Sequence, residues 1–191
     1  MTNYRTWLAA LLVFAGLACA GEPGITSVDL DKLEAAAGHA SSGQPTAAQL
    51  KALADNGYVA VIDLRGPGEE RGFDEAKAVA AAGLAYSPLP IANSAALNAD
   101  NARQLGELIA SFDGPVLVHC GSGNRVGALA ALLAAEEGAD IDEALEAGRA
   151  AGLTRSEAVV REHLKAPETP SSAAARSAVL PRLSAVFHRN S

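Results

Sequence analysis

The sequence predicts an α/β fold of three layers, in which a central and mostly parallel sheet lies between two layers of helices. Short apolar runs alternate along the chain with longer Ala- and Leu-rich stretches of helical periodicity. This alternation is typical of parallel strands joined by crossover helices. Residues 21–165 are enough to enclose one hydrophobic core, so we expect a single domain there.

The individual elements follow from local signals. Thr46 and Asn98 are helix-capping residues that precede Ala- and Leu-rich stretches, and the Asn56-Gly57 pair and Gly83 are stop signals at helix ends. We expect helices over residues 27–37, 46–56, 73–82, 98–111, 126–137, 142–151 and 154–165, strands over residues 58–64, 84–89 and 115–118, and connections over residues 39–44 and 90–97.

Residues 1–20 are predicted to be a secretory signal peptide. Arg5 precedes an apolar block, Trp7–Leu17, which is shorter than the about 20 residues that a membrane-spanning helix needs. A small-x-small cleavage signal then ends at Ala20. We therefore expect a periplasmic or secreted protein with no stable membrane association after cleavage. An uncleaved anchor and lipidation of Cys19 are the alternatives.

The net charge limits the classes of binding partner, and the cysteine count limits the possible disulfides. The net charge of −7 argues against nucleic acid or an anionic membrane as the main partner, so affinity for an anionic substrate must be local. Cleavage after Ala20 leaves Cys120 as the sole cysteine, which excludes a disulfide within the chain. Residues 166–191 are rich in Pro, Ser and Ala and are predicted to form a flexible tail.

One motif carries most of the functional information. It runs from His119 to Arg125, His-Cys-Gly-Ser-Gly-Asn-Arg, between a predicted strand and an apolar helix. Its glycines allow backbone N–H groups to converge on one anion, and the helix dipole adds its positive end. Cys120 is expected there to have a lowered pKa and to act as a thiolate, with Arg125 as a fork of donors for an oxyanion. The alternative is a buried structural cysteine before a helix-start arginine.

Three segments together resemble the bacterial beta-lactamase-hydrolase-like phosphatase-like proteins of the cysteine-dependent dual-specificity and tyrosine phosphatase superfamily. They are Ser42-Gly43-Gln44-Pro45-Thr46, Val61-Ile62-Asp63-Leu64-Arg65, and His119-Cys120 through Arg125. The likeness covers residues 25–155. It implies a dual-specificity-phosphatase-like fold that hydrolyses phosphate monoesters, on a protein or a small molecule, through a cysteinyl-phosphate and without a metal or other cofactor.

The resemblance also implies a role for each residue of the motif. Cys120 would be the nucleophile, and His119 behind it would fix the loop and lower the pKa of the thiol. The phosphoryl oxygens would be held by Gly121, Ser122, Gly123, Asn124 and Arg125. Two departures weaken this transfer: four residues separate Cys120 from Arg125 where five are usual, and Val126 stands where a hydroxyl residue commonly follows the arginine.

The general acid is the third departure. In these phosphatases the proton normally comes from an aspartate on a mobile loop beside the active site. The loop over residues 92–97 contains no carboxylate. We name Glu70, in the turn after the predicted strand over residues 58–64, as the candidate proton donor. Its neighbour Glu69 and the following Asp74 are the alternatives. Without an acid, only substrates with good leaving groups, such as aryl phosphates, would turn over well.

Two other functions remain open at this stage. In a rhodanese-type sulfurtransferase, Cys120 would carry a persulfide, and Cys-x-x-Gly-x-Arg is also the pattern of that loop. The Gly-His-Ile-x-Gly-Ala segment of rhodaneses is missing between residues 71 and 90, and the helical pattern after Gly138 favours the phosphatase. A non-catalytic phosphate-binding pseudophosphatase would keep the loop and lack the acid.

Overall fold

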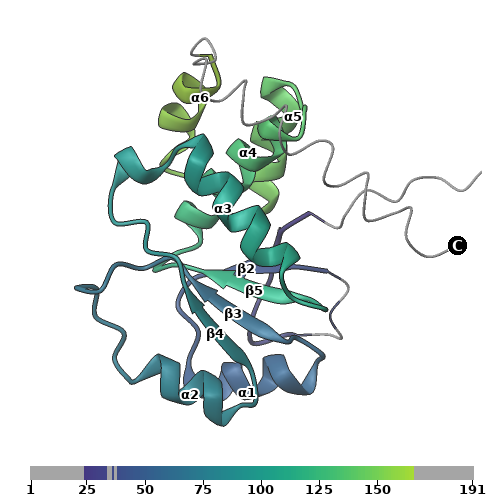
Figure 1. Ribbon diagram of the computed structural model, residues 1–191, viewed down its shortest axis with the longest axis vertical. Coiled ribbons are helices and arrows are strands. Elements are labelled where there is room, and N and C mark those ends of the chain that lie inside the picture. The colour runs from purple at the N-terminus through teal and green to yellow at the C-terminus, as the bar shows by residue number, and fades with distance from the viewer. Residues whose placement is uncertain (1–23, 34–35, 37, 166–191) are drawn as a thin grey trace, which may run out of the picture.

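The computed structural model describes residues 24–33, 36 and 38–165. Five parallel strands form one sheet in the order β1-β2-β5-β3-β4. Figure 1 shows the sheet at the centre of the molecule. The strands are β1 (Thr26–Ser27), β2 (Ala40–Ser42), β3 (Ala60–Asp63), β4 (Ala85–Pro88) and β5 (Val116–His119).

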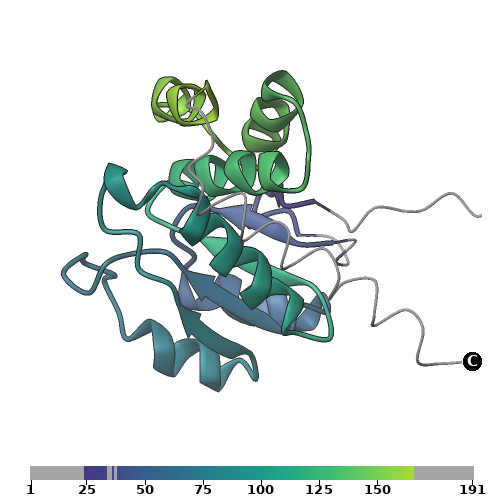
Figure 2. The same ribbon diagram turned by 45° about the horizontal axis from the view of Figure 1, so that its top comes forward.

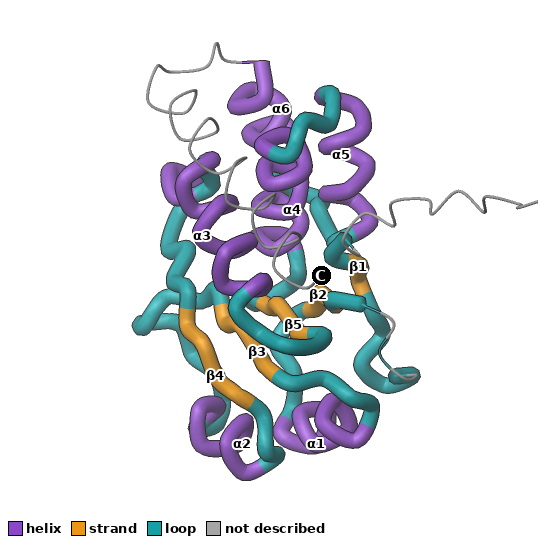
Figure 3. The backbone as a smooth tube through the Cα atoms, turned by 45° about the vertical axis from the view of Figure 1, so that its right-hand side comes forward, coloured by secondary structure: helices purple, strands orange, loops and turns teal. Residues whose placement is uncertain are grey.

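Helices cover both faces of the sheet. One face carries α1 and α2, and the opposite face carries α3, α4, α5 and α6 (Figures 1 and 2). Figure 3 separates the same three layers by secondary structure. The helices are α1 (Ala47–Asp55), α2 (Glu75–Ala81), η1 (a 3₁₀ turn, Ser94–Ala96), α3 (Ala99–Ala110), α4 (Asn124–Glu136), α5 (Ile141–Ala150) and α6 (Glu157–Lys165). This architecture confirms the three-layer α/β/α fold that the sequence predicts.

Successive residues of the central strands alternate between two hydrophobic cores. Ile62 and Val118 lie in the core under α3 and α4, whereas Val61 and Leu117 lie in the core against α1 and α2. Because side chains along a strand point to opposite faces, the same alternation continues at the carboxyl end of β5. It directs Cys120 to the face of α3 and α4, and its neighbour to the other face.

The helix that carries the predicted arginine is held very close to its neighbour. A Cβ on Gly127 of α4 would lie 2.0 Å from the backbone nitrogen of Leu153 and 2.6 Å from the carbonyl oxygen of Gly148 in α5. Only glycine fits this approach. The start of α4 is therefore fixed by backbone packing as well as by its buried apolar face.

Most of the predicted elements are confirmed. Thr46 forms a capping box at α1, in which its hydroxyl accepts from the amide of Gln49, and Asn98 caps α3 by accepting from the amide of Asn101. The predicted strands over residues 58–64, 84–89 and 115–118 correspond to β3, β4 and β5. The predicted loop over residues 90–97 contains the short turn η1.

Two predictions at the start of the domain are wrong. The helix expected over residues 27–37 is absent from its described part, where Ser27 pairs with Ser41 in the sheet and residues 28–33 form a turn region. An Asp29 carboxylate oxygen accepts from the amide of Asp31 and favours that turn. The connection expected over residues 39–44 contains the buried strand β2, whose small residues let the Ser41 hydroxyl donate to the carbonyl of Ala151 at 2.7 Å.

The predicted signal peptide and the predicted tail lie outside the described residues. Cleavage after Ala20 stays a prediction, and lipidation of Cys19 stays an alternative to it. Among the helices of the described part, none combines the length and the apolar character needed to cross a membrane.

Candidate active site

The predicted nucleophile stands at the carboxyl end of the central strand. Cys120 follows β5 directly and is buried, and its amide donates to the carbonyl of Ser42 in β2 at 3.4 Å. Gly123, in the left-handed region with φ 81°, then precedes α4 at the N-cap position and carries no side chain that could cap it. The first turn of α4 therefore presents its positive end at the cysteine loop.

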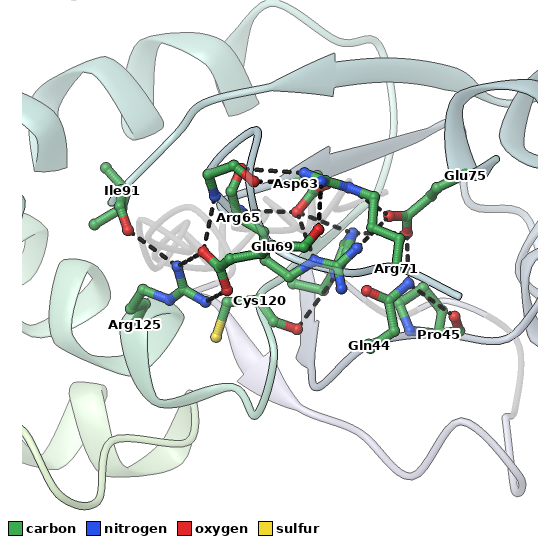
Figure 4. A network of polar contacts seen from close by, with 12 residues as sticks. Gln44, Pro45, Asp63, Arg65, Glu69, Arg71, Glu75, Ile91, Cys120 and Arg125 are labelled. Atoms are coloured by element: carbon green, nitrogen blue, oxygen red, sulfur yellow. Dashed lines mark hydrogen bonds and ion pairs between the residues drawn. The ribbon is translucent and has the colours of Figure 1, made fainter. Parts of the chain in front are cut away.

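Arg125 lies in that first turn and is held by two partners. Its Nη1 and Nη2 donate to Oε1 and Oε2 of Glu69, each at 2.6 Å, and Nη1 also donates to the carbonyl of Ile91 at 3.0 Å. Figure 4 shows the two side chains face to face, with the sulfur of Cys120 beside the guanidinium. Sequence motifs pointed to Glu69 only as an alternative acid, and no local signal predicts its contact with Arg125, 56 residues away.

The bidentate pair shifts the pKa of both partners. Hydrogen bonds from Arg125 hold the pKa of Glu69 at about 2, and the Gly66 amide, which donates to Oε1 at 2.8 Å, acts in the same direction. The Glu69 carboxylate in turn raises the pKa of Arg125, and the side chain of Cys120 adds to that effect against the opposing effect of burial. At neutral pH the pair is therefore fully ionised.

The cysteine loop is also held from two sides by segments distant in sequence. Gly43 after β2 bridges to Ser122, and a Cβ on Gly43 would lie 3.3 Å from the carbonyl oxygen of Gly121. On the other side, the buried Asn124 side chain donates to the Ser156 hydroxyl at 2.7 Å and accepts from the Thr154 amide at 2.9 Å. The side chain of Asn124 therefore fixes the loop. Only its backbone N–H is left for the binding of phosphoryl oxygens that the resemblance implies.

His119 lies on the other face of the sheet, away from the thiol. It is buried between Asp63 and Glu75, and its Nε2 is 3.0 Å from Oε1 of Glu75 but out of line for a hydrogen bond. Its Nδ1 is 3.4 Å from the carbonyl oxygen of Cys120. The ring thus lies against the backbone of the loop, and the role that the resemblance implies for it stays a prediction.

A buried ion-pair network surrounds this histidine. Arg65 binds both carboxylates, with its Nη2 3.0 Å from Glu75 Oε2 and its Nε 3.4 Å from Asp63 Oδ1. Arg71 donates from Nη2 to Asp63 Oδ2 at 2.7 Å, and the Tyr86 hydroxyl donates to the same oxygen at 2.9 Å. Asp63 and Arg65 therefore form a buried ion pair at the end of β3.

The network keeps Asp63 ionised. Burial by itself raises the pKa of Asp63, but the hydrogen bond from the Arg65 amide, the charge of His119 and the bonds from Arg71 and Tyr86 outweigh it, so the pKa is lowered. Burial and the bond to Asp63 raise the pKa of Tyr86 to about 12. Two guanidinium groups thus neutralise the two buried carboxylates.

The same cluster contains the ligand types of a metal site. One atom each of Asp63, Glu75 and His119 lies within 4.8 Å of the others. Both carboxylates are already bound by Arg65 and Arg71, however, so a cation would have to displace a guanidinium and meet its charge. The arrangement fits an ion-pair network better than a metal centre.

A pocket of about 350 Å³ opens over Arg125. It lies between the loop after β4 and the start of α6. Its walls are formed by Glu69, Ala92, Asn93, Ser94, Leu97, Arg125 and Ser156. Glu70, the acid named from the sequence, is exposed and is not among these residues, and Asp74 caps α2 by accepting from the Lys77 amide at 3.1 Å.

Comparison with known proteins points to one class of enzyme. A family model described as "Polymorphic toxin system, DSP-PTPase phosphatase" matches residues 35–139. A beta-lactamase hydrolase-like protein of Xylella fastidiosa is 38% identical over 136 residues, which are 69% of this chain and 31% of that protein. The chain thus spans about a third of the length of the curated relatives that it matches.

Solved structures with the same fold are also phosphatases. The crystal structure of a putative phosphatase from Neisseria meningitidis is 26% identical and superposes with a TM-score of 0.57, covering 65% of this chain and 89% of that one. TpbA of P. aeruginosa, solved in complex with pTyr, is 20% identical with a TM-score of 0.51, covering 71% and 83%. The second likeness concerns the fold alone.

Proposed function

The chain belongs to the family of DSP-PTPase phosphatases of polymorphic toxin systems, and we propose on this premise that it hydrolyses phosphate monoesters through a cysteinyl-phosphate on Cys120. One observation carries the proposal. A buried cysteine follows β5 directly, and a short glycine-containing loop connects it to a helix whose first turn bears Arg125. A thiolate nucleophile and a cradle for a phosphoryl group need this arrangement.

In the first step the Cys120 thiolate attacks phosphorus, the S–P bond forms and the P–O bond to the leaving group breaks. The leaving oxygen takes the electron pair of that bond. Arg125 and the backbone N–H groups of residues 121–124 bind the three non-bridging oxygens, where negative charge is held during the transfer. This attraction is strong because the loop lies at the positive end of α4.

In the second step water attacks phosphorus, the S–P bond breaks and the thiolate is restored as inorganic phosphate leaves. The residue after the arginine is the buried Val126, which has no hydroxyl to assist this step. The hydroxyl residue of the loop between Cys120 and Arg125 is Ser122, which is exposed and stands before the arginine instead of after it. We propose His119 as a positioning residue that holds the carbonyl of Cys120 and so the course of the loop.

The purified full-length chain tests the function with an aryl phosphate. We expect release of phosphate that vanadate inhibits, and its loss in Cys120→Ser. Cys19→Ser, which changes the only other cysteine of the sequence, is the matched control and should retain the activity. Trapping of labelled phosphate on the wild-type protein after an acid quench would report the intermediate.

Two outcomes would overturn the proposal. Formation of thiocyanate from thiosulfate and cyanide, without release of phosphate from the aryl ester, would show that the protein is a sulfurtransferase. Binding of phosphate without turnover of any ester would leave a binding module.

We propose that the protein acts outside the cytoplasm after removal of residues 1–20. The sequence of this segment supports the proposal. Fractionation of cells that express the full-length chain, with N-terminal sequencing of the product, tests it. Intact residues 1–20 in a cytoplasmic fraction would overturn it.

A further inference from the structure

Of the described residues that line the pocket over Arg125, one is a carboxylate, and that carboxylate is already engaged. Glu69 accepts two hydrogen bonds from Arg125 and a third from the Gly66 amide. The other residues of the pocket walls are uncharged apart from Arg125 itself. The ionised form of Glu69 is favoured by all three donors, which opposes a role as proton donor.

The contact with Glu69 leaves Arg125 able to bind a second anion. Glu69 uses Nη1 and Nη2, the outer edge of the guanidinium, while Nη2 also faces the cysteine loop, 3.8 Å from where a Cβ on Gly121 would lie. A guanidinium has five N–H donors on two usable edges, so the edge formed by Nε and Nη2 can donate to the oxygens of a phosphoryl group. Glu69 and the carbonyl of Ile91 together hold the side chain in that orientation.

Within the described part of the chain, the nearby carboxylates are engaged elsewhere or exposed. Asp63 and Glu75 are bound by arginines on the opposite face of the sheet. Asp74 caps α2, and Asp100 pairs with Arg103. Glu70 is exposed, and it is its backbone carbonyl that accepts from Arg65.

We propose that Glu69 positions Arg125 and donates no proton, so that the site cleaves aryl phosphates and leaves alkyl phosphates almost untouched. This inference rests on the proposed function. A leaving oxygen that receives no proton departs as an anion, after taking the electron pair of the P–O bond, and is protonated later by solvent. Phenolates are stable enough to leave in this way and alkoxides are not. A general acid normally accelerates such a reaction by a factor of about 10²–10⁴, which this site would lack.

The pocket walls agree with a monophosphate of this kind. Among the residues that the structure describes, Arg125 is the only cation that lines the pocket, and the polar side chains beside the Arg125–Glu69 pair are the uncharged Asn93, Ser94 and Ser156. A substrate with several phosphate groups would find no second guanidinium or ammonium group there.

A series of ring-substituted phenyl phosphates, with an alkyl phosphate at its end, tests the inference. The phenyl esters share size and shape and differ in the acidity of the leaving phenol. For the wild-type chain we expect kcat/KM to fall steadily as the leaving group becomes less acidic, and to fall a further 100-fold or more, about the contribution of a missing acid, at the alkyl ester. A flat series would overturn the inference.

Glu69→Gln separates positioning from acid catalysis. Loss of the charge on Glu69 loosens Arg125 for every substrate, so we expect kcat/KM to fall by one common factor of about 10 with the slope of the series unchanged. Glu69→Asp should recover part of this loss. Asp113→Asn, in the exposed turn before β5 at the far end of the sheet, is the matched control and should behave as wild type.

The remaining outcomes are distinct. If Glu69→Gln or Glu70→Gln slows poor leaving groups selectively, that glutamate donates the proton and the inference is wrong. If the wild-type chain hydrolyses no phosphate ester at all, the proposed function itself fails.

Discussion

Two arginine–glutamate pairs lie at the same end of the sheet and differ in almost every property. Arg65 and Glu75 are 3% and 0% exposed, on the face of α1 and α2. Arg125 and Glu69 are 21% and 37% exposed, on the face of the pocket. The first pair is one link in a closed network, whereas the second has an open side that faces solvent and the cysteine loop (Figure 4).

The difference separates stability from function. Buried ions cost much free energy when they lose a partner, because no water replaces it. Exposed ions are screened and lose little. The buried pair therefore has to stay intact for the sheet end to fold, while in the exposed pair one edge of Arg125 stays able to bind another anion. The alternation of side chains along β3 and β5 assigns the two tasks to opposite faces.

The largest effect should come from opening the buried pair. Glu75→Gln removes the charge that faces both Arg65 and Arg71 and leaves them short of a counterion. We expect a loss of about 3–5 kcal/mol in the free energy of unfolding, measured by urea denaturation. Glu69→Gln is the matched change in the exposed pair and should cost about 0–1 kcal/mol. Equal losses would contradict the comparison.

Arg125→Lys should reverse that pattern. A lysine cannot hold Glu69 and a phosphoryl group with a planar fork, so we expect kcat/KM for an aryl phosphate to fall about 10²–10³-fold. The urea midpoint should change little because the side chain is partly exposed. Arg149→Lys, in an exposed pair with Glu157, is the control. Full activity of the Arg125 variant would show that the fork is not needed.

Tyr86→Phe weakens the buried network without removing a charge. Asp63 loses one hydrogen bond at 2.9 Å but keeps those of Arg71 and of the Arg65 amide. We expect a loss of about 1 kcal/mol in the free energy of unfolding, again by urea denaturation, and an unchanged kcat/KM. A large fall in activity at unchanged stability would mean that the network acts on the chemistry.

The smallest expected effect is on the free energy of unfolding at low pH. The pKa of Glu69 is about 2 in the fold and near its usual 4.5 in the unfolded chain, so the unfolded chain binds the proton more tightly. The stabilisation from this pair is complete above about pH 4.5 and is lost as the pH falls toward 2. The gap in unfolding free energy between wild type and Glu69→Gln should close over this window. A constant gap down to pH 2 would contradict the lowered pKa.

Local sequence was enough for most of the fold and for the identity of the motif. Capping by Thr46 and Asn98, and the apolar runs of β3 and β5, are short-range effects, and they were predicted correctly. The strand β2 was missed because Ala-Ser-Ser carries no β-branched residue, and only its place between β1 and β5 makes it a strand. The prediction of a helix from Ser27 onward was wrong because Thr26 and Ser27 pair in the sheet and the residues after them form a turn at Asp29.

The candidate site divides in the same way. The sequence by itself determined the cysteine, the glycine loop and the arginine, because seven adjacent residues between a strand and a helix form a local structure. Only the tertiary structure decided which glutamate meets Arg125. Glu69 and Glu70 are neighbours of the same type, and the turn closed by the bond from the Glu69 amide to the Gly66 carbonyl at 3.1 Å points the first one at the arginine 56 residues away. Side-chain direction in a turn, and therefore long-range pairing, depends on where the rest of the fold places the partner.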